Sequence, residues 1–135
     1  MSTLKVNTVQ HNSSGFNNLV QFTNSSGTQN GVLCRAWVNF QGTSTVTIRD
    51  DFNVSSVTDH GTGDYTVNLS NAVTNSNHAA LIQGSGDTNG WHAVGFTYYI
   101  RTTYSSSAVA CGFFKLDNSG ARADQTIASV AVFGS

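Results

Sequence analysis

The chain has 135 residues, a mass of 14.3 kDa and a formal net charge of −1 at pH 7, so it is long enough for one hydrophobic core and too short for two. Asn, Ser, Thr and Gly make up 60 residues while Glu and Pro are absent, which excludes a helical bundle, and 39% hydrophobic residues exclude a disordered chain. With only six Lys and Arg and no apolar run near the roughly 20 residues that span a bilayer, we expect neither a nucleic-acid partner nor insertion into a membrane.

Residues 1–30 are predicted to form an N-terminal arm. Short apolar stretches at residues 4–9 and 16–22 are separated and followed by clusters of Asn, Ser and Gly. Such stretches can pair as strands, but they cannot form a core on their own. We therefore expect neighbouring chains to bury the apolar side chains of the arm, which are Leu4, Val6, Val9, Phe16, Leu19, Val20 and Phe22.

Residues 31–135 are predicted to form an antiparallel β-sandwich. Apolar and polar residues alternate with a period of two through residues 32–40 and again through residues 45–52, which predicts a hairpin. Further strands are predicted at residues 54–58, 65–69, 79–83, 91–103, 108–116 and 126–133. Short strands, turn signals about every ten residues and no helical period are typical of an all-β sandwich or barrel.

The alternation in the first hairpin also predicts which side chains share a face. One face of the first strand carries Val32, Cys34, Ala36, Val38 and Phe40. One face of the second strand carries Val46, Ile48, Asp50 and Phe52. We expect each set to stay on one face, because successive strand residues point to opposite sides of a sheet.

Neither a metal nor a cofactor is expected. The four histidines are dispersed without H-x-H spacing, and the two cysteines, Cys34 and Cys111, show no zinc-binding spacing. Both cysteines lie in apolar stretches, which predicts two buried free thiols, with a disulfide between neighbouring strands as the alternative. Asp59 and Asp64 are predicted to hold a tight hairpin loop, with a calcium site as the alternative.

The chain is not predicted to be an enzyme. No G-x-S-x-G nucleophile motif occurs in the sequence. Asp50 and Asp51 cannot face each other across a sugar, as glycoside hydrolysis requires, because neighbouring strand residues point to opposite faces. The sequence therefore favours a binding or structural role.

Residues 35–68 contain a dense series of motifs. The motifs are the runs 35–40 (RAWVNF), 42–43 (GT), 47–49 (TIR), 52–59 (FNVSSVTD) and 61–68 (GTGDYTVN). Together they resemble a module of tail-fibre proteins from tailed phages, especially those of cyanobacteria and other marine bacteria. The first ten residues, MSTLKVNTVQ, and the run SVAVFG at 129–134 are similar to the start and the C-terminal strand of the same proteins.

The resemblance implies a β-sandwich subunit of a homotrimeric fibre in the virion tail, assembled in the host cytoplasm. Its arm would attach to a tail or baseplate protein, and its other end would bind a host surface receptor, expected to be a polysaccharide, during adsorption. The residues expected to make the attachment are Leu4, Val6, Val9, Phe16 and Phe22. The alternative is a structural or decoration protein of the virion with no receptor role.

The candidate receptor site lies in the loop at residues 84–90 and just after it, outside the motifs that carry the resemblance. Asp87 and Asn89 can bond sugar hydroxyls beside the aromatic ring of Trp91 and the imidazole of His92. Tyr104 begins a second loop, and it joins this site only if the chain bends, because an unbroken strand would put the two loops at opposite ends. The alternative for Trp91 is that it begins a strand and packs in the core.

Overall fold

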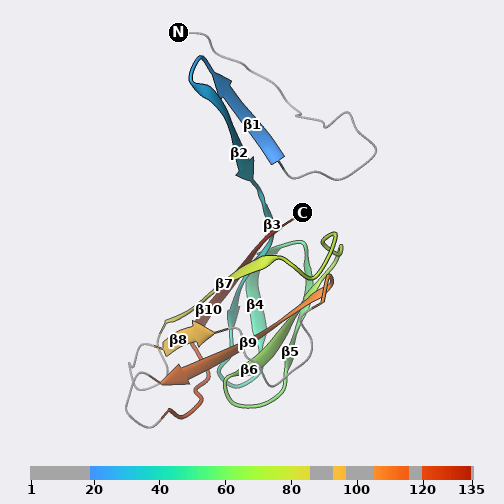
Figure 1. The fold of residues 1–135 in the computed structure, drawn as a ribbon. Helices are drawn as coiled ribbons and strands as arrows, with labels where there is room; N and C mark the ends of the chain where they lie inside the picture. The colour runs from blue at the N-terminus through green and yellow to red at the C-terminus, as the bar shows by residue number, and fades with distance from the viewer. Residues whose placement is uncertain (1–18, 86–92, 97–104, 116–119, 135) are drawn as a thin grey trace.

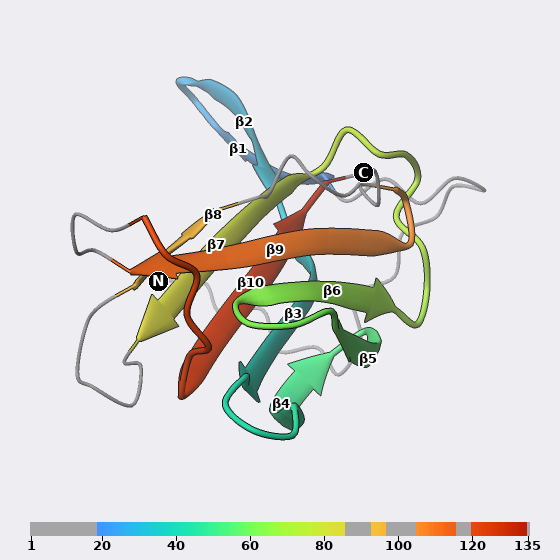
Figure 2. The same ribbon diagram turned by 90° about the horizontal axis from the view of Figure 1, so that it is seen from below.

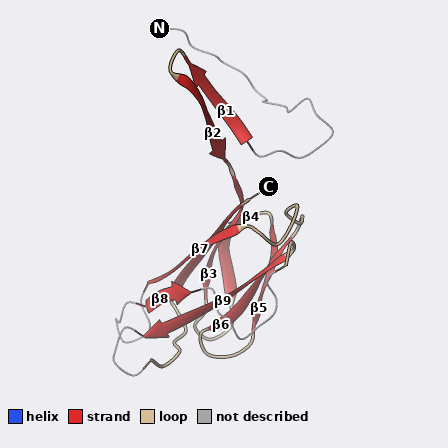
Figure 3. Cartoon of the chain, viewed as in Figure 1, coloured by secondary structure: helices blue, strands red, loops and turns tan. Residues whose placement is uncertain are grey.

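The computed structural model describes residues 19–85, 93–96, 105–115 and 120–134, which contain ten strands (Figure 1, Figure 3). Within this part of the chain there is no helix, and hence none long and apolar enough to cross a membrane. The strands are β1 (Leu19–Asn24), β2 (Gly27–Val32), β3 (Cys34–Gln41), β4 (Thr47–Phe52), β5 (Val54–Asp59), β6 (Asp64–Leu69), β7 (Ala79–Ser85), β8 (Ala93–Phe96), β9 (Ala108–Lys115) and β10 (Ile127–Phe133).

Eight of these strands form two four-stranded antiparallel sheets that pack face to face (Figure 2). Sheet I has the order β4-β3-β10-β7, and sheet II has the order β5-β6-β9-β8. The first and last strands of the sandwich, β3 and β10, are neighbours in the middle of sheet I. In Figure 2 the strands of sheet II run obliquely across those of sheet I. The predicted antiparallel β-sandwich is therefore confirmed.

Most of the individual strand predictions are confirmed as well. The strands predicted at residues 54–58 and 65–69 form the hairpin β5–β6. The strands predicted at residues 79–83, 108–116 and 126–133 correspond to β7, β9 and β10. In the strand predicted at residues 91–103, the described residues 93–96 form β8. The strand predicted at residues 32–40 is divided, because Leu33 separates the end of β2 from the start of β3.

The strands β1 and β2 form a hairpin that extends away from the two sheets (Figure 1). The expected boundary between arm and head, at residues 30 and 31, lies inside β2. Of the predicted attachment residues, Phe22 belongs to β1 and pairs with Gln29 through the backbone. The other attachment residues lie outside the described part of the chain, and they are Leu4, Val6, Val9 and Phe16.

The core lies between the sheets, and three aromatic rings form its centre. Phe40 from β3, Tyr65 from β6 and Phe113 from β9 are fully buried, with ring centroids 5.3 to 6.4 Å apart. Apolar side chains from both sheets surround them, including Ala36, Val38, Val54, Val67, Leu69, Val109, Ala128, Val130 and Val132. Because both sheets contribute to this core, burying the inner face of either one requires the other.

The hydroxyl of Tyr65 connects sheet II to two loops of sheet I. It donates to Asp124 Oδ1 at 2.6 Å and lies 3.0 Å from the carbonyl oxygen of Gly42. The same carboxylate oxygen accepts the amide proton of Gly63 at 2.7 Å, and the Gly42 amide donates to the carbonyl oxygen of Gln125 at 2.8 Å. A Cβ added at Gly42 would lie 2.5 Å from the Tyr65 hydroxyl oxygen, so this close approach requires glycine.

A β-bulge between β3 and β4 overturns part of the predicted alternation. Asp50 pairs with Asn39 but Ile48 pairs with Phe40, so Arg49 is an extra residue in β4. A bulge reverses the side-chain direction that follows it. Ile48 packs against the core as expected, whereas Asp50 and Phe52 lie on the opposite face, and their predicted placement with Ile48 is wrong.

Both cysteines are free thiols, and they lie on different sheets. Cys34 in β3 is partly buried, and its Sγ donates to the carbonyl oxygen of Ala36 at 3.2 Å. Cys111 in β9 is fully buried. Burial, and then the carboxylate of Asp64, raise the pKa of Cys111 to about 12. The prediction of free thiols is therefore confirmed, and their burial is complete only at Cys111.

Replacing Tyr65 by Phe tests the buried hydroxyl, because the ring stays and only its hydrogen bonds are lost. We expect the free energy of unfolding at pH 7 to fall by about 1–3 kcal/mol. Burial, and then Asp124, raise the pKa of Tyr65 well above its usual range. The pKa of this phenol in the unfolded chain is 10.0, so its contribution to the free energy of unfolding is fully present below that pH and is lost as the pH rises further.

Urea denaturation of both proteins at pH 7 and at about pH 11 measures these effects. Between the two pH values, the free energy of unfolding should fall more for the wild type than for Tyr65→Phe. Any pH-dependent contribution of Cys111 is the same in both proteins and cancels in this comparison. Equal stability at pH 7 would show that the hydroxyl does not hold the two loops.

Candidate functional site

The face of sheet I that points away from sheet II carries a line of apolar side chains across all four strands. Cross-strand pairing places Phe52 of β4 beside Trp37 of β3, Trp37 beside Ala131 of β10, and Ala131 beside Leu81 of β7. Three of these side chains are strongly exposed, with Phe52 at 54%, Trp37 at 36% and Leu81 at 65%. We call these four residues the apolar row.

Strand alternation explains why these side chains face outward. In β3, Ala36 and Val38 are buried in the core, so Trp37 between them points to the other side. The same holds for Ala131 in β10 and for Leu81 in β7, whose neighbours pack into or against the core. Phe52 joins them because the bulge at Arg49 reverses the alternation of β4.

A polar line runs beside the apolar row and completes a shallow groove. Asn39, Ser129 and Gln83 are cross-strand neighbours, and Asn39 Nδ2 donates to Ser129 Oγ at 2.9 Å. The groove holds about 640 Å³ and is lined by the polar line and by the members of the apolar row other than Phe52. Its lining side chains are uncharged, so the groove offers apolar contact and neutral hydrogen-bonding groups.

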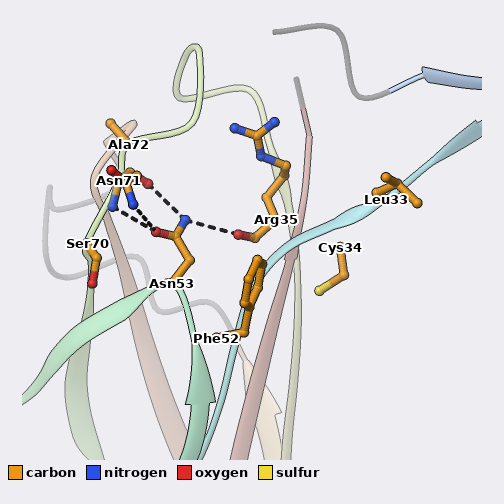
Figure 4. A pocket seen from close by; sticks show the side chains of 8 residues that line it. All are labelled: Leu33, Cys34, Arg35, Phe52, Asn53, Ser70, Asn71 and Ala72. Atoms are coloured by element: carbon orange, nitrogen blue, oxygen red, sulfur yellow. Dashed lines mark hydrogen bonds between the residues drawn. The ribbon is translucent and has the colours of Figure 1, made fainter. Parts of the chain in front are cut away.

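A second groove lies where the chain passes from sheet I to sheet II (Figure 4). It holds about 1060 Å³ and continues the apolar row, because Phe52 lines it together with Leu33, which is 57% exposed. The other side of this groove is formed by the loop at residues 70–72. The two grooves therefore flank one partly apolar surface.

The side chain of Asn53 connects the two sides of the second groove through hydrogen bonds. Its Nδ2 donates to the carbonyl oxygens of Arg35 and Asn71, each at 3.0 Å, and its Oδ1 accepts the Asn71 amide proton at 2.8 Å (Figure 4). The Ser70 amide donates to the Asn53 carbonyl oxygen at 3.1 Å. Asn53 has φ of 58°, a left-handed conformation that Asn tolerates better than most residues. The side chain of Asn53 is thus engaged in hydrogen bonds within the chain.

The structure does not test the candidate receptor residues that the sequence predicts. Asp87, Asn89, Trp91, His92 and Tyr104 all lie outside the described residues. The register of the neighbouring strands does locate the points where the chain enters and leaves these segments.

Two described residues that flank these segments, Ser85 and Ser105, lie at different ends of the sandwich. Phe133 pairs with both Cys34 and Ala79, so β7 starts beside the hairpin and reaches Ser85 at the far end of sheet I. Ser105, which follows Tyr104, belongs instead to a turn bonded to residues 69 and 73, beside the loop that Asn53 holds.

Asp59 and Asp64 have separate structural roles in the β5–β6 loop. Asp59 Oδ1 accepts the amide proton of Gly61 at 2.8 Å, whereas Asp64 Oδ2 pairs with Arg122 Nη1 at 3.0 Å. The described residues contain no group of three or more His, Cys, Asp or Glu arranged to hold a metal ion. Asp59 therefore bonds within the hairpin loop, as expected, whereas Asp64 pairs with a segment far away in the sequence.

Sequence reasoning missed the apolar row, although one signal was present. Leu33 and Trp37 are apolar residues on the otherwise polar side of the alternation at residues 32–40, and Leu81 interrupts the expected alternation of its own strand. Such out-of-phase apolar residues indicate a strand that is covered on both faces. What the sequence lacked was the register that aligns them.

Comparison with known proteins found no matching family model, no matching curated protein and no matching solved structure.

Substitution of Asn53 tests whether its side chain maintains the second groove. Asn53→Ala removes the side-chain hydrogen bonds and keeps a Cβ at positive φ, so the free energy of unfolding should fall by roughly 2–4 kcal/mol. Asn53→Gly loses the same bonds without the backbone penalty, and it should be about 1 kcal/mol more stable than Asn53→Ala. Chemical denaturation measures both, and a glycine variant as stable as the wild type would contradict the role of the side chain.

Proposed function

We propose that the chain is a subunit of a phage tail fibre that binds a host surface receptor, expected to be a polysaccharide, during adsorption. The observation that carries this proposal is the series of motifs in residues 35–68, which resembles modules of tail-fibre proteins and covers β3, β4, β5 and β6. The β-sandwich fold supports the proposal, because it is the fold that the resemblance implies.

The residues that carry the resemblance have specific structural roles, which argues against a chance match of composition. Tyr65 is the buried anchor of the core, and Asp64 pairs with Arg122. Gly63 has φ of 63°, and an added Cβ would lie 2.6 Å from the carbonyl oxygen of Phe113. Asn53 closes the turn between the sheets. The motifs that carry the resemblance therefore contain residues with defined roles in this fold.

The positions of the two ends fit a fibre subunit. The hairpin, which contains the last part of the predicted arm, extends from one end of sheet I. The strand β7 ends at Ser85, at the opposite end, just before Asp87 and Asn89. A subunit held by its arm would present that second end outward. We propose a homotrimer in the virion tail, with the arm bound to a tail or baseplate protein.

Electron microscopy of virions labelled with antibody against this protein tests the proposed location. We expect label on the tail, because a fibre subunit joins the virion there. Label restricted to the capsid would overturn the fibre proposal and favour the alternative of a decoration protein with no receptor role. Unlabelled virions, with the protein found only in the lysate, would exclude both virion roles.

Replacing Asp87, Asn89 and Trp91 together by Ala tests the receptor site. Adsorption of virions to host cells should fall at least about 100-fold, because a sugar site loses its stacking ring and two hydrogen-bonding groups. The melting temperature and the oligomeric state should stay as in the wild type. The matched control is Tyr104→Ala, which we expect to leave adsorption unchanged because Ser105 lies at the other end of the sandwich. Unchanged adsorption by the folded triple variant would move the receptor site elsewhere.

A further inference from the structure

We infer that copies of this chain pack against one another through the outer face of sheet I, with the apolar row at the centre of the contact and the β1–β2 hairpin continuing it. The number of copies, three, rests on the proposed function. The surface itself follows from the exposure, register and charge of the described residues.

The exposure of the apolar row is the first observation. Phe52, Trp37 and Leu81 are each more than a third exposed, and cross-strand pairing places them side by side across the sheet. Single exposed apolar residues are ordinary, but a contiguous line of large ones marks an interaction surface. Aromatic anchors such as Trp also dominate the energetics of protein interfaces.

The hairpin is the second observation, and it is independent of the row. Two paired strands without a third are marginally stable at best in water. In Figure 1 this hairpin extends away from both sheets, and β2 is joined to β3 through Leu33 alone. It is a separate two-stranded sheet that is attached to the start of β3 in sheet I. A partner that packs on sheet I and carries the same extension would support both hairpins at once.

The arrangement of the row favours identical copies as the occupants. In a cyclic assembly each subunit contacts its two neighbours through two different patches. The row meets that requirement because it has a large exposed side chain at each edge of the sheet, Phe52 on β4 and Leu81 on β7. The strands β7 and β10 carry no charged residue, and the charges of β3 and β4 cancel, since they carry two arginines and two aspartates. A net charge of −1 for the chain adds little repulsion between copies.

The size of the face agrees with a contact that includes the hairpin. Four strands about 4.8 Å apart, each about seven residues long at about 3.3 Å per residue, give a face of roughly 440 Å². A stable interface buries about 800 Å² on each partner. The sheet face alone falls short of that area, and a six-residue hairpin offers roughly 200 Å² on each of its two sides. The sheet face and both sides of the hairpin together offer roughly 840 Å² per subunit, about the area that one stable interface buries on each partner.

Sedimentation velocity of the full chain at micromolar concentration tests this inference. The wild type should sediment as a trimer, three times 14.3 kDa. Leu81→Asp and Phe52→Asp place a charge at either edge of the row, and each should weaken association at least about 30-fold, as the loss of an interface hot spot does. The matched control is Thr62→Asp, because Thr62 is exposed in the β5–β6 loop of sheet II, and it should remain a trimer.

A crosslinking measurement keeps the test decisive if a charged variant fails to fold. Phe52 and Leu81 are both replaced by Cys in a Cys34→Ser background, and mild oxidation should then join each copy to its neighbours through these edges. Crosslinked dimers and trimers support the inference. Failure to crosslink, in a protein that still sediments as a trimer, overturns it.

Three other outcomes would also overturn the inference. A monomeric wild type would do so, and labelling of virions would still decide the proposed function separately. Charged variants that remain trimeric, while deletion of residues 2–32 gives monomers, would place the contact in the hairpin and the arm alone. Charged variants that stay trimeric but no longer bind host polysaccharide would make the row a sugar site.

Discussion

A phenol hydroxyl buried among aromatic rings must keep its hydrogen bonds, since an unpaired buried polar group costs several kcal/mol. Tyr65 lies between Phe40 and Phe113 in the centre of the core, and its acceptors come from segments far away in the chain. The loop after β3 must bring Gly42 to it, and the segment before β10 must bring Asp124. This requirement closes one end of the sandwich and determines where β10 begins.

The outer face of sheet I depends in turn on the position of β10. This strand pairs with β3 on one side and β7 on the other, so its register decides which of their residues become neighbours. The small side chain of Ala131 then lies between Trp37 and Leu81 and leaves the groove beside them. A slip of one residue would exchange the inner and outer faces of the strand. The register of β10 with β3 and β7 thus determines both which residues fill the core and which residues form the outer face of sheet I.

An isolated copy of this chain would leave apolar side chains and a two-stranded hairpin in contact with water. It exposes Phe52, Trp37 and Leu81 in a line, and it extends a two-stranded hairpin away from its core. Both features become favourable when identical chains pack together, because apolar area is removed from water and the hairpins gain neighbours. The low charge of the chain permits such close packing. These features fit the proposed fibre subunit, in which stability is a property of the assembly.

The sequence by itself determined the all-β class, the β5–β6 hairpin and the positions of β7, β9 and β10, because alternation and turn residues act over a few neighbouring positions. It did not reveal the bulge at Arg49, since a bulge depends on how β4 pairs with β3. It also did not reveal the apolar row, and the receptor residues that it proposed lie outside the described part of the chain. Asn39 and Ser129, hydrogen-bonded on the outer face, are 90 positions apart. Local patterns decide to which side a strand residue points, but only the long-range pairing of strands decides what lies beside it.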